Sequence, residues 1–521
     1  MLFVLLFGFL LRFYKVSEIP TGFFADEAAN GYNAYKLLTT GKDEYGVSFP
    51  FYFQSFGDYR TPVAIYSMIP SIFIFGLNQF SVRFTMVIYG TLTILFLYLF
   101  VKELFWNEQS FIKDVIALSS SLFLAISPWH IHFSRSGFEF IPMPFYLIVG
   151  LFFLFRFLHR TQKPINLVLS TIFFIITFYT AYVVQIVLIP FLFCIFLLYR
   201  KKNLNKKILK ISLISLIFFL LGLIPFITAT LSGQALTRFN SVSPFSHGKN
   251  LKDVLKPMAK TYIDHFQLDF LFLKGDIDMP RHFISRHSLK GIGELYLFQL
   301  PLLILGIFYL FLKYKKILIF SLVFLILYPI GSTIIAEEPF AHRSLFGVVP
   351  FQILSAIGLT SIFYFLSKII TNSKLKIVIM TIMICFFVII CSLSLKDYVN
   401  KYFNEYPLYS SDFWGWQYGP KETMQYFLSV KNNYDELYMS GEFNSGNIFL
   451  KFYDPKNTCQ NKCMLGDFWR NPKIYNSKKR QLFSLSPEYL KNSSLSNRFI
   501  VKKIIFYPNK TIAFQIGEIV E

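Results

Sequence analysis

The chain has 521 residues, of which 54% are hydrophobic and 16% are charged, and its formal net charge is +21. A soluble protein has roughly 25% charged residues, so this composition excludes an ordinary soluble domain. The apolar residues form blocks, for example residues 211–231 and 376–395. Each block is long enough to cross ~30 Å of hydrocarbon as a helix of about 20 residues. The composition therefore predicts an α-helical polytopic membrane protein.

In chain order, the apolar blocks predict about eleven membrane helices. We expect them near residues 1–14, 82–104, 112–128, 139–158, 165–180, 181–199, 208–230, 294–312, 316–335, 344–366 and 375–395. The block 62–77 is short and flanked by prolines, which favours a juxtamembrane or re-entrant segment.

Lysine and arginine gather in alternate connections between these blocks, at 102–113, 156–163, 199–207, 313–316 and 368–376. This is the positive-inside pattern, which places those connections in the cytoplasm. The segments 15–61, 129–138, 231–293, 336–343 and 396–521 are then predicted to face outside. The remaining charge is scattered rather than striped, so we expect no nucleic-acid partner.

The tail differs from the rest of the chain in composition. Residues 396–521 contain a helix start at Pro420 and strand-like runs bounded by Gly, Pro and Asn, which predicts a small extracytoplasmic α/β domain after a membrane domain of residues 1–395. Five cysteines are too few for a disulfide framework. Cys459 and Cys463 in "CQNKC" form a small-loop disulfide or are free thiols, and both interpretations stay open.

Asp26 and Glu27 stand side by side in the first predicted external loop. They could begin a helix, where its dipole favours negative charge. Alternatively, one carboxylate could deprotonate an acceptor while a cation holds the other. Without further context the capping interpretation is the simpler one.

Cationic side chains recur at the same predicted side of the membrane. Asp58 and Arg60 precede an apolar segment, and Arg83 opens the second predicted helix. An arginine at the outer end of a helix runs against the positive-inside rule and suits a phosphate, although it could also snorkel to lipid.

Three later loops add polar groups. Arg135 stands in "SPWHIHFSRSGFEF", which also holds His130, His132 and Glu139, and His342 and Arg343 follow Glu337 and Glu338 in a short loop. The loop 231–293 contains Asp276 and His282, which could line a substrate cavity together with Asp58 and Arg60. A histidine there could join a carboxylate of the first loop at a metal, but the spacing matches no fixed metal motif and no ligand is assigned.

These groups converge on one membrane face, where carboxylates, cations and aromatic residues suit a lipid-anchored phosphate. Hardly any ionisable residue falls at mid-membrane, whereas transporters usually need charges or broken helices there. The pattern favours chemistry at a surface.

Several stretches resemble the C-type glycosyltransferase superfamily, in the branch of protein O-mannosyltransferases and bacterial aminoarabinose transferases. They are "IPTGFFADEAANGYNAYKLLTTGKDEYG", "RTPVAIYSMIPSIFIFGLNQFSVRF" and "ISPWHIHFSRSGFE", followed by "RHSLKGIGELY", "EEPFAHRSLFGVVP" and "WGWQYGPKE". The resemblance is dense over residues 10–140 and thins afterwards.

The resemblance implies an integral-membrane glycosyltransferase that moves a sugar from a polyprenyl-phosphate donor to a protein, lipid or glycan acceptor outside the membrane. It implies that Asp26 is the general base and that Glu27 orients the acceptor or a cation. The donor phosphate would lie among Arg83, Arg135, His342 and Arg343. "DYRTP" departs from the usual basic-Pro-Pro, which leaves the role of Arg60 open.

Other functions stay open at this point. A polytopic transporter or flippase predicts mid-membrane charges or repeat symmetry, and a scaffold for envelope assembly would tolerate loss of Asp26. A polymerase or ligase of lipid-linked glycans of the cell envelope would also act outside. The sequence does not specify the sugar, the acceptor, the oligomeric state or a divalent metal, which some relatives use. We expect a bacterial-type plasma membrane protein.

Overall fold

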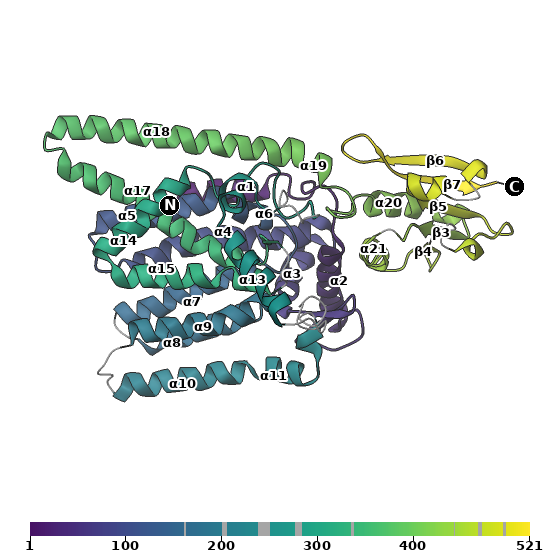
Figure 1. Cartoon of the computed structure of the whole chain (residues 1–521). Coiled ribbons are helices and arrows are strands. Elements are labelled where there is room, and N and C mark those ends of the chain that lie inside the picture. The colour runs from purple at the N-terminus through teal and green to yellow at the C-terminus, as the bar shows by residue number, and fades with distance from the viewer. Residues whose placement is uncertain are drawn as a thin grey trace.

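The computed structural model describes residues 1–521 except 161–162, 201–205, 238–250, 277–283, 335–337, 442, 467–470, 493–495 and 521. A long bundle of helices carries a small sheet domain at one of its ends (Figure 1). The expected fold class, a polytopic helical protein with a small C-terminal α/β domain, is confirmed.

Each predicted membrane helix coincides with one or two helices of the bundle. They are α1 (Leu2–Phe13), α4 (Gln79–Leu104), α5 (Ser110–Ile126), α7 (Pro142–His159), α8 (Pro164–Phe178), α9 (Tyr182–Tyr199), α10 (Lys206–Gly222) with α11 (Ile224–Leu231), α14 (Gln299–Lys313), α15 (Lys315–Leu327) with α16 (Ile330–Thr333), α17 (Val348–Ile369) and α18 (Ser373–Asn400). Seven stretches of the described chain are long and apolar enough to cross a membrane: 79–104, 142–159, 182–199, 208–231, 315–333, 345–369 and 373–409.

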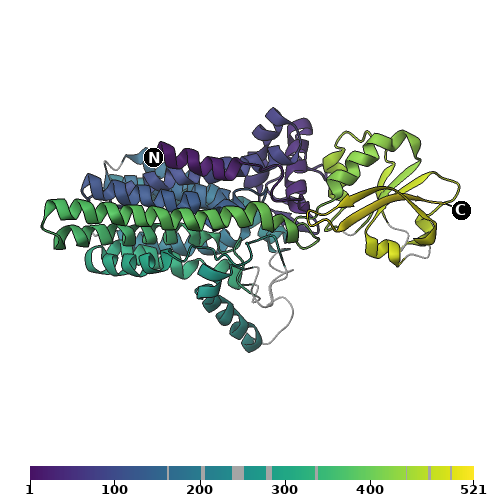
Figure 2. The same cartoon turned by 90° about the horizontal axis from the view of Figure 1, so that it is seen from above.

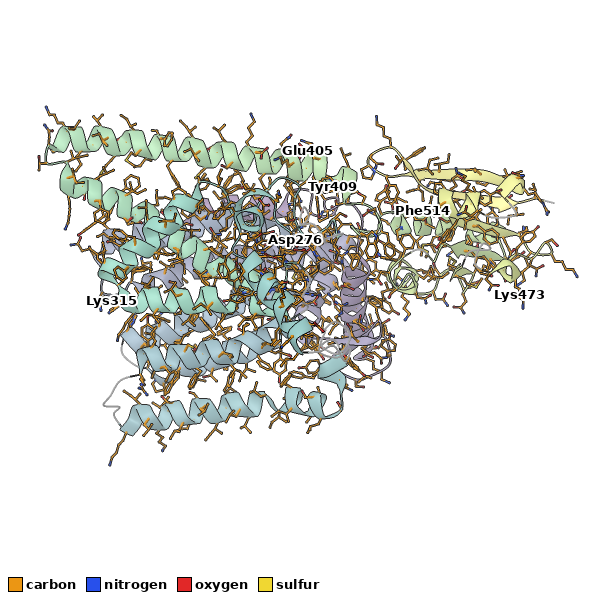
Figure 3. The ribbon with its side chains drawn as sticks, viewed as in Figure 1. Asp276, Lys315, Glu405, Tyr409, Lys473 and Phe514 are labelled. Carbon is orange, nitrogen blue, oxygen red and sulfur yellow. A yellow bond between two sulfur atoms is a disulfide. The ribbon has the colours of Figure 1, made fainter. Side chains whose placement is uncertain are left out.

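The bundle has two different ends. The turns that carry the lysine and arginine clusters, such as the one between α17 and α18, lie at the end far from the sheet domain, where Figure 3 labels Lys315. The opposite end carries α2 (Ala25–Thr40), α3 (Pro62–Phe75), α6 (Pro128–Phe133) and α13 (Leu251–Asp264). The alternation of charge along the sequence is therefore a separation in space.

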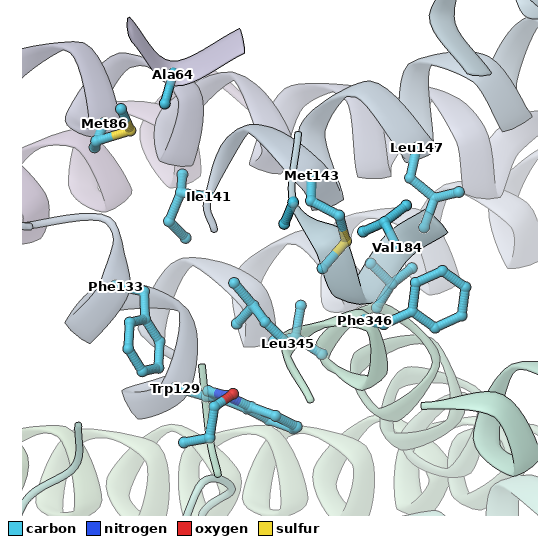
Figure 4. Close-up of a cluster of buried hydrophobic side chains, with 14 of the residues drawn as sticks. Ala64, Met86, Trp129, Phe133, Ile141, Met143, Leu147, Val184, Leu345 and Phe346 are labelled. Atoms are coloured by element: carbon cyan, nitrogen blue, oxygen red, sulfur yellow. The ribbon is translucent and has the colours of Figure 1, made fainter. Parts of the chain in front are cut away.

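The core of the bundle runs around α17, whose residues 348–361 are all buried. Trp129 is buried there and donates from Nε1 to the carbonyl of Ala341 at 2.8 Å, beside Leu345 (Figure 4). α14 approaches α17 closely at Gly306 and Gly358, where an added Cβ would lie 2.2 Å from a carbonyl oxygen of α17 and 1.9 Å from one of α14, respectively. Small residues permit such backbone approach between membrane helices.

The tail begins where α18 ends. A π-helical turn (Lys401–Glu405) and α19 (Tyr406–Tyr409) lead into α20 (Pro420–Val430), α21 (Asn447–Tyr453) and α22 (Pro487–Lys491). The sheet has the order β4-β3-β5-β7-β6, in which β3 pairs parallel with β4 and β5, and β7 pairs antiparallel with β5 and β6. Its strands are β3 (Glu436–Met439), β4 (Cys463–Leu465), β5 (Gln481–Leu485), β6 (Phe499–Phe506) and β7 (Ile512–Ile519).

Two details of the tail bear on the sequence analysis. Cys459 and Cys463 form a disulfide, which decides between the two interpretations left open for "CQNKC". α18 continues to Asn400, so the domain division between residues 395 and 396 stays a proposal.

The tail packs on α2 through α21. The rings of Phe452 and Phe23 lie 4.8 Å apart, and Lys451 pairs with Glu44 at 2.9 Å. Gly31 of α2 faces Phe452 so closely that an added Cβ would lie 2.9 Å from its ring. The sheet domain therefore supports the helix that carries Asp26 and Glu27 (Figure 1).

Candidate active site

Asp26 lies in a cluster of three carboxylates around one guanidinium. Arg60 Nη2 lies 2.8 Å from Asp26 Oδ1, Arg60 Nη1 lies 3.5 Å from Glu139 Oε1, and Arg60 Nε lies 3.9 Å from Asp58 Oδ1. These four side chains keep between 11% and 18% of their surface exposed. Most of the surface of these side chains is therefore buried, and a small part of each one remains open to solvent.

A hairpin positions Asp58 and Arg60. Strands β1 (Phe53–Ser55) and β2 (Asp58–Arg60) are antiparallel and joined by Phe56 and Gly57, whose φ angles are +53° and +87°. Two positive φ values at the centre of a two-residue loop are typical of the turns that match strand twist. Pro62 then starts α3 and ends the hairpin.

The charges in this cluster do not balance. Burial opposes the charge on Arg60, but the carboxylates of Asp26, Glu139 and Asp58 outweigh it and raise the pKa of Arg60. One cation among three acids leaves a formal excess of two negative charges when all are ionised. Such a site attracts a further cation.

Glu27 faces the opposite way and is fully buried. Its Oε1 accepts from Arg83 Nε at 2.9 Å and from the amide of Gly137 at 2.6 Å, and its Oε2 accepts from Arg83 Nη2 at 3.0 Å. Oε2 also accepts from the amide of Phe24 at 3.2 Å, which caps the start of α2. Glu27 therefore caps α2, and the role of Asp26 as a general base stays a prediction.

Arg83 and Arg135 hold the end of α1 and the irregular chain between α1 and α2. Beyond Glu27, Arg83 donates to the carbonyls of Val16, Pro20 and Gly22. Arg135 donates to the carbonyls of Leu11, Arg12, Tyr14 and Ile19. Both side chains are fully buried. Their hydrogen bonds go to the protein itself, and donor-phosphate binding by either one stays a prediction.

A second cluster joins two of the later loops. One ligand atom each of Asp276, His287 and His342 lies within 4.8 Å of the others, and all three residues are buried. The two imidazole rings are 4.1 Å apart. Asp276 accepts from Ser288 Oγ at 2.8 Å and from the amide of Ala341 at 2.9 Å, so its carboxylate is held in place (Figure 3 labels Asp276). Two imidazoles and one carboxylate are a ligand set that suits Zn²⁺.

Phe140 lies between the two clusters. Its ring centroid is 4.7 Å from that of His342, and its neighbour Glu139 contacts Arg60. Arg343 follows His342 in the sequence, and its guanidinium lies 4.8 Å from the centre of the ring of Phe340. His282, the remaining predicted cavity residue, lies outside the described residues.

Three residues of this region fall in the polar loops of the sequence but have no role assigned from it. Glu139 joins the Arg60 cluster and His287 joins Asp276. Arg286 stacks on Phe24 at 3.8 Å and donates to the carbonyl of Trp414 at 2.7 Å. Burial lowers the pKa of Arg286 to about 10, against the attraction of Asp26. The adjacency of Arg286 and His287 in a polar loop was the available signal.

Comparison with known proteins identifies the fold. Residues 59–228 match the family model described as dolichyl-phosphate-mannose-protein mannosyltransferase. A comparison with curated protein sequences finds no match. The fold is that of C-type glycosyltransferases, and the resemblance seen in the sequence is confirmed at this level.

Three of the solved structures that resemble this chain are compared with it by identity, coverage and TM-score. ArnT from Cupriavidus metallidurans in the apo state has 12% identity and a TM-score of 0.54, with 100% of this chain and 97% of that chain covered. The same enzyme bound to undecaprenyl phosphate has 10% identity and a TM-score of 0.53, covering 100% and 98%. The Archaeoglobus fulgidus oligosaccharyltransferase tethered with an acceptor peptide has 12% identity and a TM-score of 0.54, covering 98% and 73%. At identities this low, the structural likeness establishes a shared fold and nothing more.

Proposed function

We propose that the chain is an integral-membrane glycosyltransferase. It moves a sugar from a polyprenyl-phosphate donor to an acceptor on the external face of a bacterial-type plasma membrane. The observation that carries this proposal is the cluster in which Arg60 orients the carboxylate of Asp26 at 2.8 Å while leaving it accessible. A placed carboxylate is what an acceptor hydroxyl or amine needs in order to become a nucleophile.

The reaction is a single displacement. The acceptor oxygen or nitrogen attacks C1 of the sugar and forms the new glycosidic bond, while its proton passes to Asp26. The bond between C1 and the phosphate oxygen breaks, and the lipid phosphate leaves with the electron pair. Attack from the face opposite the leaving group inverts C1. Cations near the departing phosphate stabilise its charge.

The residues divide into two groups. Asp26 is the general base, and Arg60, with Asp58 and Glu139 as its other partners, fixes its orientation. We place the donor phosphate towards His342 and Arg343, in the loop that ends in α17. Glu27, Arg83 and Arg135 act as positioning residues, because their buried hydrogen bonds fix the segment 11–27.

A divalent metal is a further part of the proposal. Asp276, His287 and His342 would hold it, and their mixed nitrogen and oxygen donors fit Zn²⁺. A cation there would add positive charge near the place that we assign to the donor phosphate.

The acceptor is the most open part. Among the similar structures, one ArnT structure is bound to undecaprenyl phosphate and the archaeal oligosaccharyltransferase is tethered with an acceptor peptide. These ligands support a lipid-linked donor for this chain, and its acceptor is a protein, a lipid or a glycan.

The test is transfer by the purified protein in nanodiscs supplied with radiolabelled polyprenyl-phosphate sugars and extracts of the cell envelope. We expect release of lipid phosphate together with label in an acceptor. Movement of labelled lipid between leaflets without release of phosphate would support the flippase alternative. Elongation of a lipid-linked glycan would support a polymerase instead.

A further inference from the structure

A cavity of about 390 Å³ lies between the membrane bundle and the tail. One wall is the loop before α2, with Ser17, Thr21 and Phe23, and another is the start of α20, with Gln417 and Glu422. Its volume falls in the range of small-molecule sites, which often form where two domains meet. The Arg60 cluster does not contribute to its lining.

Gln417 brings an unused hydrogen-bond donor to this cavity. Its Oε1 accepts from the amide of Ala25 at 3.2 Å, and this contact fixes which side-chain atom is the nitrogen. Nε2 is buried and has no hydrogen-bond partner among the described residues. The residue is 1% exposed and has a φ of +52°. A residue other than glycine at positive φ is strained, and such strain concentrates at functional sites.

Glu422 brings an unused acceptor. Its Oε2 is buried and has no hydrogen-bond partner in the described chain. Burial raises the pKa of Glu422, and nearby backbone amides and lysines only partly oppose this. A buried carboxylate oxygen without a partner is costly unless a ligand or water satisfies it.

Aromatic rings form part of the remaining lining, beside the polar side chains of Glu18, Gln79 and Lys421. Phe23, Phe403, Tyr418 and Tyr453 border the same space. A hydroxyl group can accept from an amide and donate to a carboxylate at the same time. Aromatic rings provide flat surfaces for the apolar face of a ring that carries several hydroxyls.

We propose that this cavity is a sugar-binding subsite that holds one pyranose ring, with a ring hydroxyl between Gln417 Nε2 and Glu422 Oε2. The ring belongs either to the donor sugar or to an acceptor glycan, since both present the same hydroxyl chemistry. Gln417 also accepts from the amide of Ala25, the residue before Asp26, so its side chain connects the occupant to the helix of the proposed general base. The subsite itself does not depend on the proposed transfer reaction.

Saturation-transfer NMR on the full chain in nanodiscs tests the subsite without turnover. The probes are methyl α-mannopyranoside and methyl β-glucopyranoside at millimolar concentration. We expect transfer to at least one glycoside from the wild type and at least a fivefold weaker signal from Glu422→Gln. Ser17→Trp, which fills the cavity and keeps both polar groups, should reduce the signal similarly.

Glu488→Gln is the matched control. Glu488 is an exposed glutamate in the first turn of α22, which also begins with a proline. Its variant should keep the wild-type signal. Absence of transfer to both glycosides, or an undiminished signal in both Glu422→Gln and Ser17→Trp, would overturn the proposal. Displacement of the glycoside by a polyprenyl-phosphate sugar assigns the subsite to the donor, and simultaneous binding assigns it to the acceptor.

Discussion

Arg83 and Glu27 are joined by two hydrogen bonds of 2.9 and 3.0 Å, and neither side chain is exposed to solvent. Their positions are 56 residues apart, one at the start of α4 and one in the first turn of α2. This pair fixes the helix that presents Asp26, so its loss should act first on stability.

Arg83→Gln should destabilise the protein by about 3–5 kcal/mol, because the carboxylate of Glu27 would remain buried without its cation. Thermal unfolding in nanodiscs measures this as a lower midpoint. The control is Arg480→Gln, whose side chain is 69% exposed and lies 3.7 Å from Asp435. An exposed pair contributes about 0–1 kcal/mol, so equal effects of the two variants would contradict the assignment.

Asp26→Asn should lower turnover by roughly 10²–10⁴-fold while leaving the unfolding midpoint close to wild type. The asparagine keeps an oxygen for Arg60 but cannot take the proton of the acceptor. Affinity for the donor lipid should change little, since Asp26 acts on the acceptor. Wild-type turnover in this variant would remove Asp26 from the role of base.

Metal content tests the second cluster independently of activity. Elemental analysis of the purified protein should find about one divalent ion per chain, and His287→Ala should lower that content severalfold. His159→Ala is the control, because His159 lies in the last turn of α7 and contacts the carbonyl of Glu103. A metal content that is near zero in the wild type, or unchanged in His287→Ala, would rule out this site.

Acidification should destabilise the protein through His132. Burial lowers the pKa of His132 to about 4, and its Nε2 lies 2.6 Å from the carbonyl of Arg286. The unfolded chain keeps the usual histidine pKa of 6.5. The contribution of neutral, buried His132 to the free energy of unfolding is therefore complete above pH 6.5 and is lost as the pH falls towards 4. The loss is on the order of 3 kcal/mol. His132→Gln should flatten the fall of the unfolding midpoint between pH 7 and pH 4.5, and an unchanged slope would contradict this.

The disulfide provides a test of the external face. In intact cells, Cys459 and Cys463 should resist a maleimide reagent until a reductant is added, because a disulfide persists in an oxidising compartment. Mass spectrometry of the peptide that contains both cysteines reads this directly. Free thiols at both positions would place the tail in the cytoplasm and would reverse the proposed topology.

The sequence predicts the helices well, because a lipid environment requires long apolar stretches and no other feature of the chain produces them. It also brings Asp26 and Arg60 near each other, since both fall in one loop. It does not predict the partners of Arg83 and Arg135. A count of cations at one face suggests a phosphate, whereas these two guanidinium groups bind carbonyls at the end of α1 and in the loop that follows it, within residues 11–22.

Long-range pairings are the other part that sequence reasoning misses. Glu139 reaches Arg60 across 79 positions, and the cluster of Asp276, His287 and His342 joins residues from two separate loops. No local periodicity encodes such contacts, because they depend on how the helix ends assemble. The sequence likewise does not point to Gln417, because a positive φ and an amide nitrogen without a partner can be recognised only in the structure.

The contact of α21 with α2 limits how the tail of this chain can be exchanged for that of another protein. Phe452 fills the space left by the missing side chain of Gly31, and Lys451 neutralises Glu44. A chimera that keeps the bundle and borrows a tail from a relative would bring a foreign surface against the helix of Asp26. An exchange of the tail should therefore succeed only when residues 25–44 are exchanged together with it.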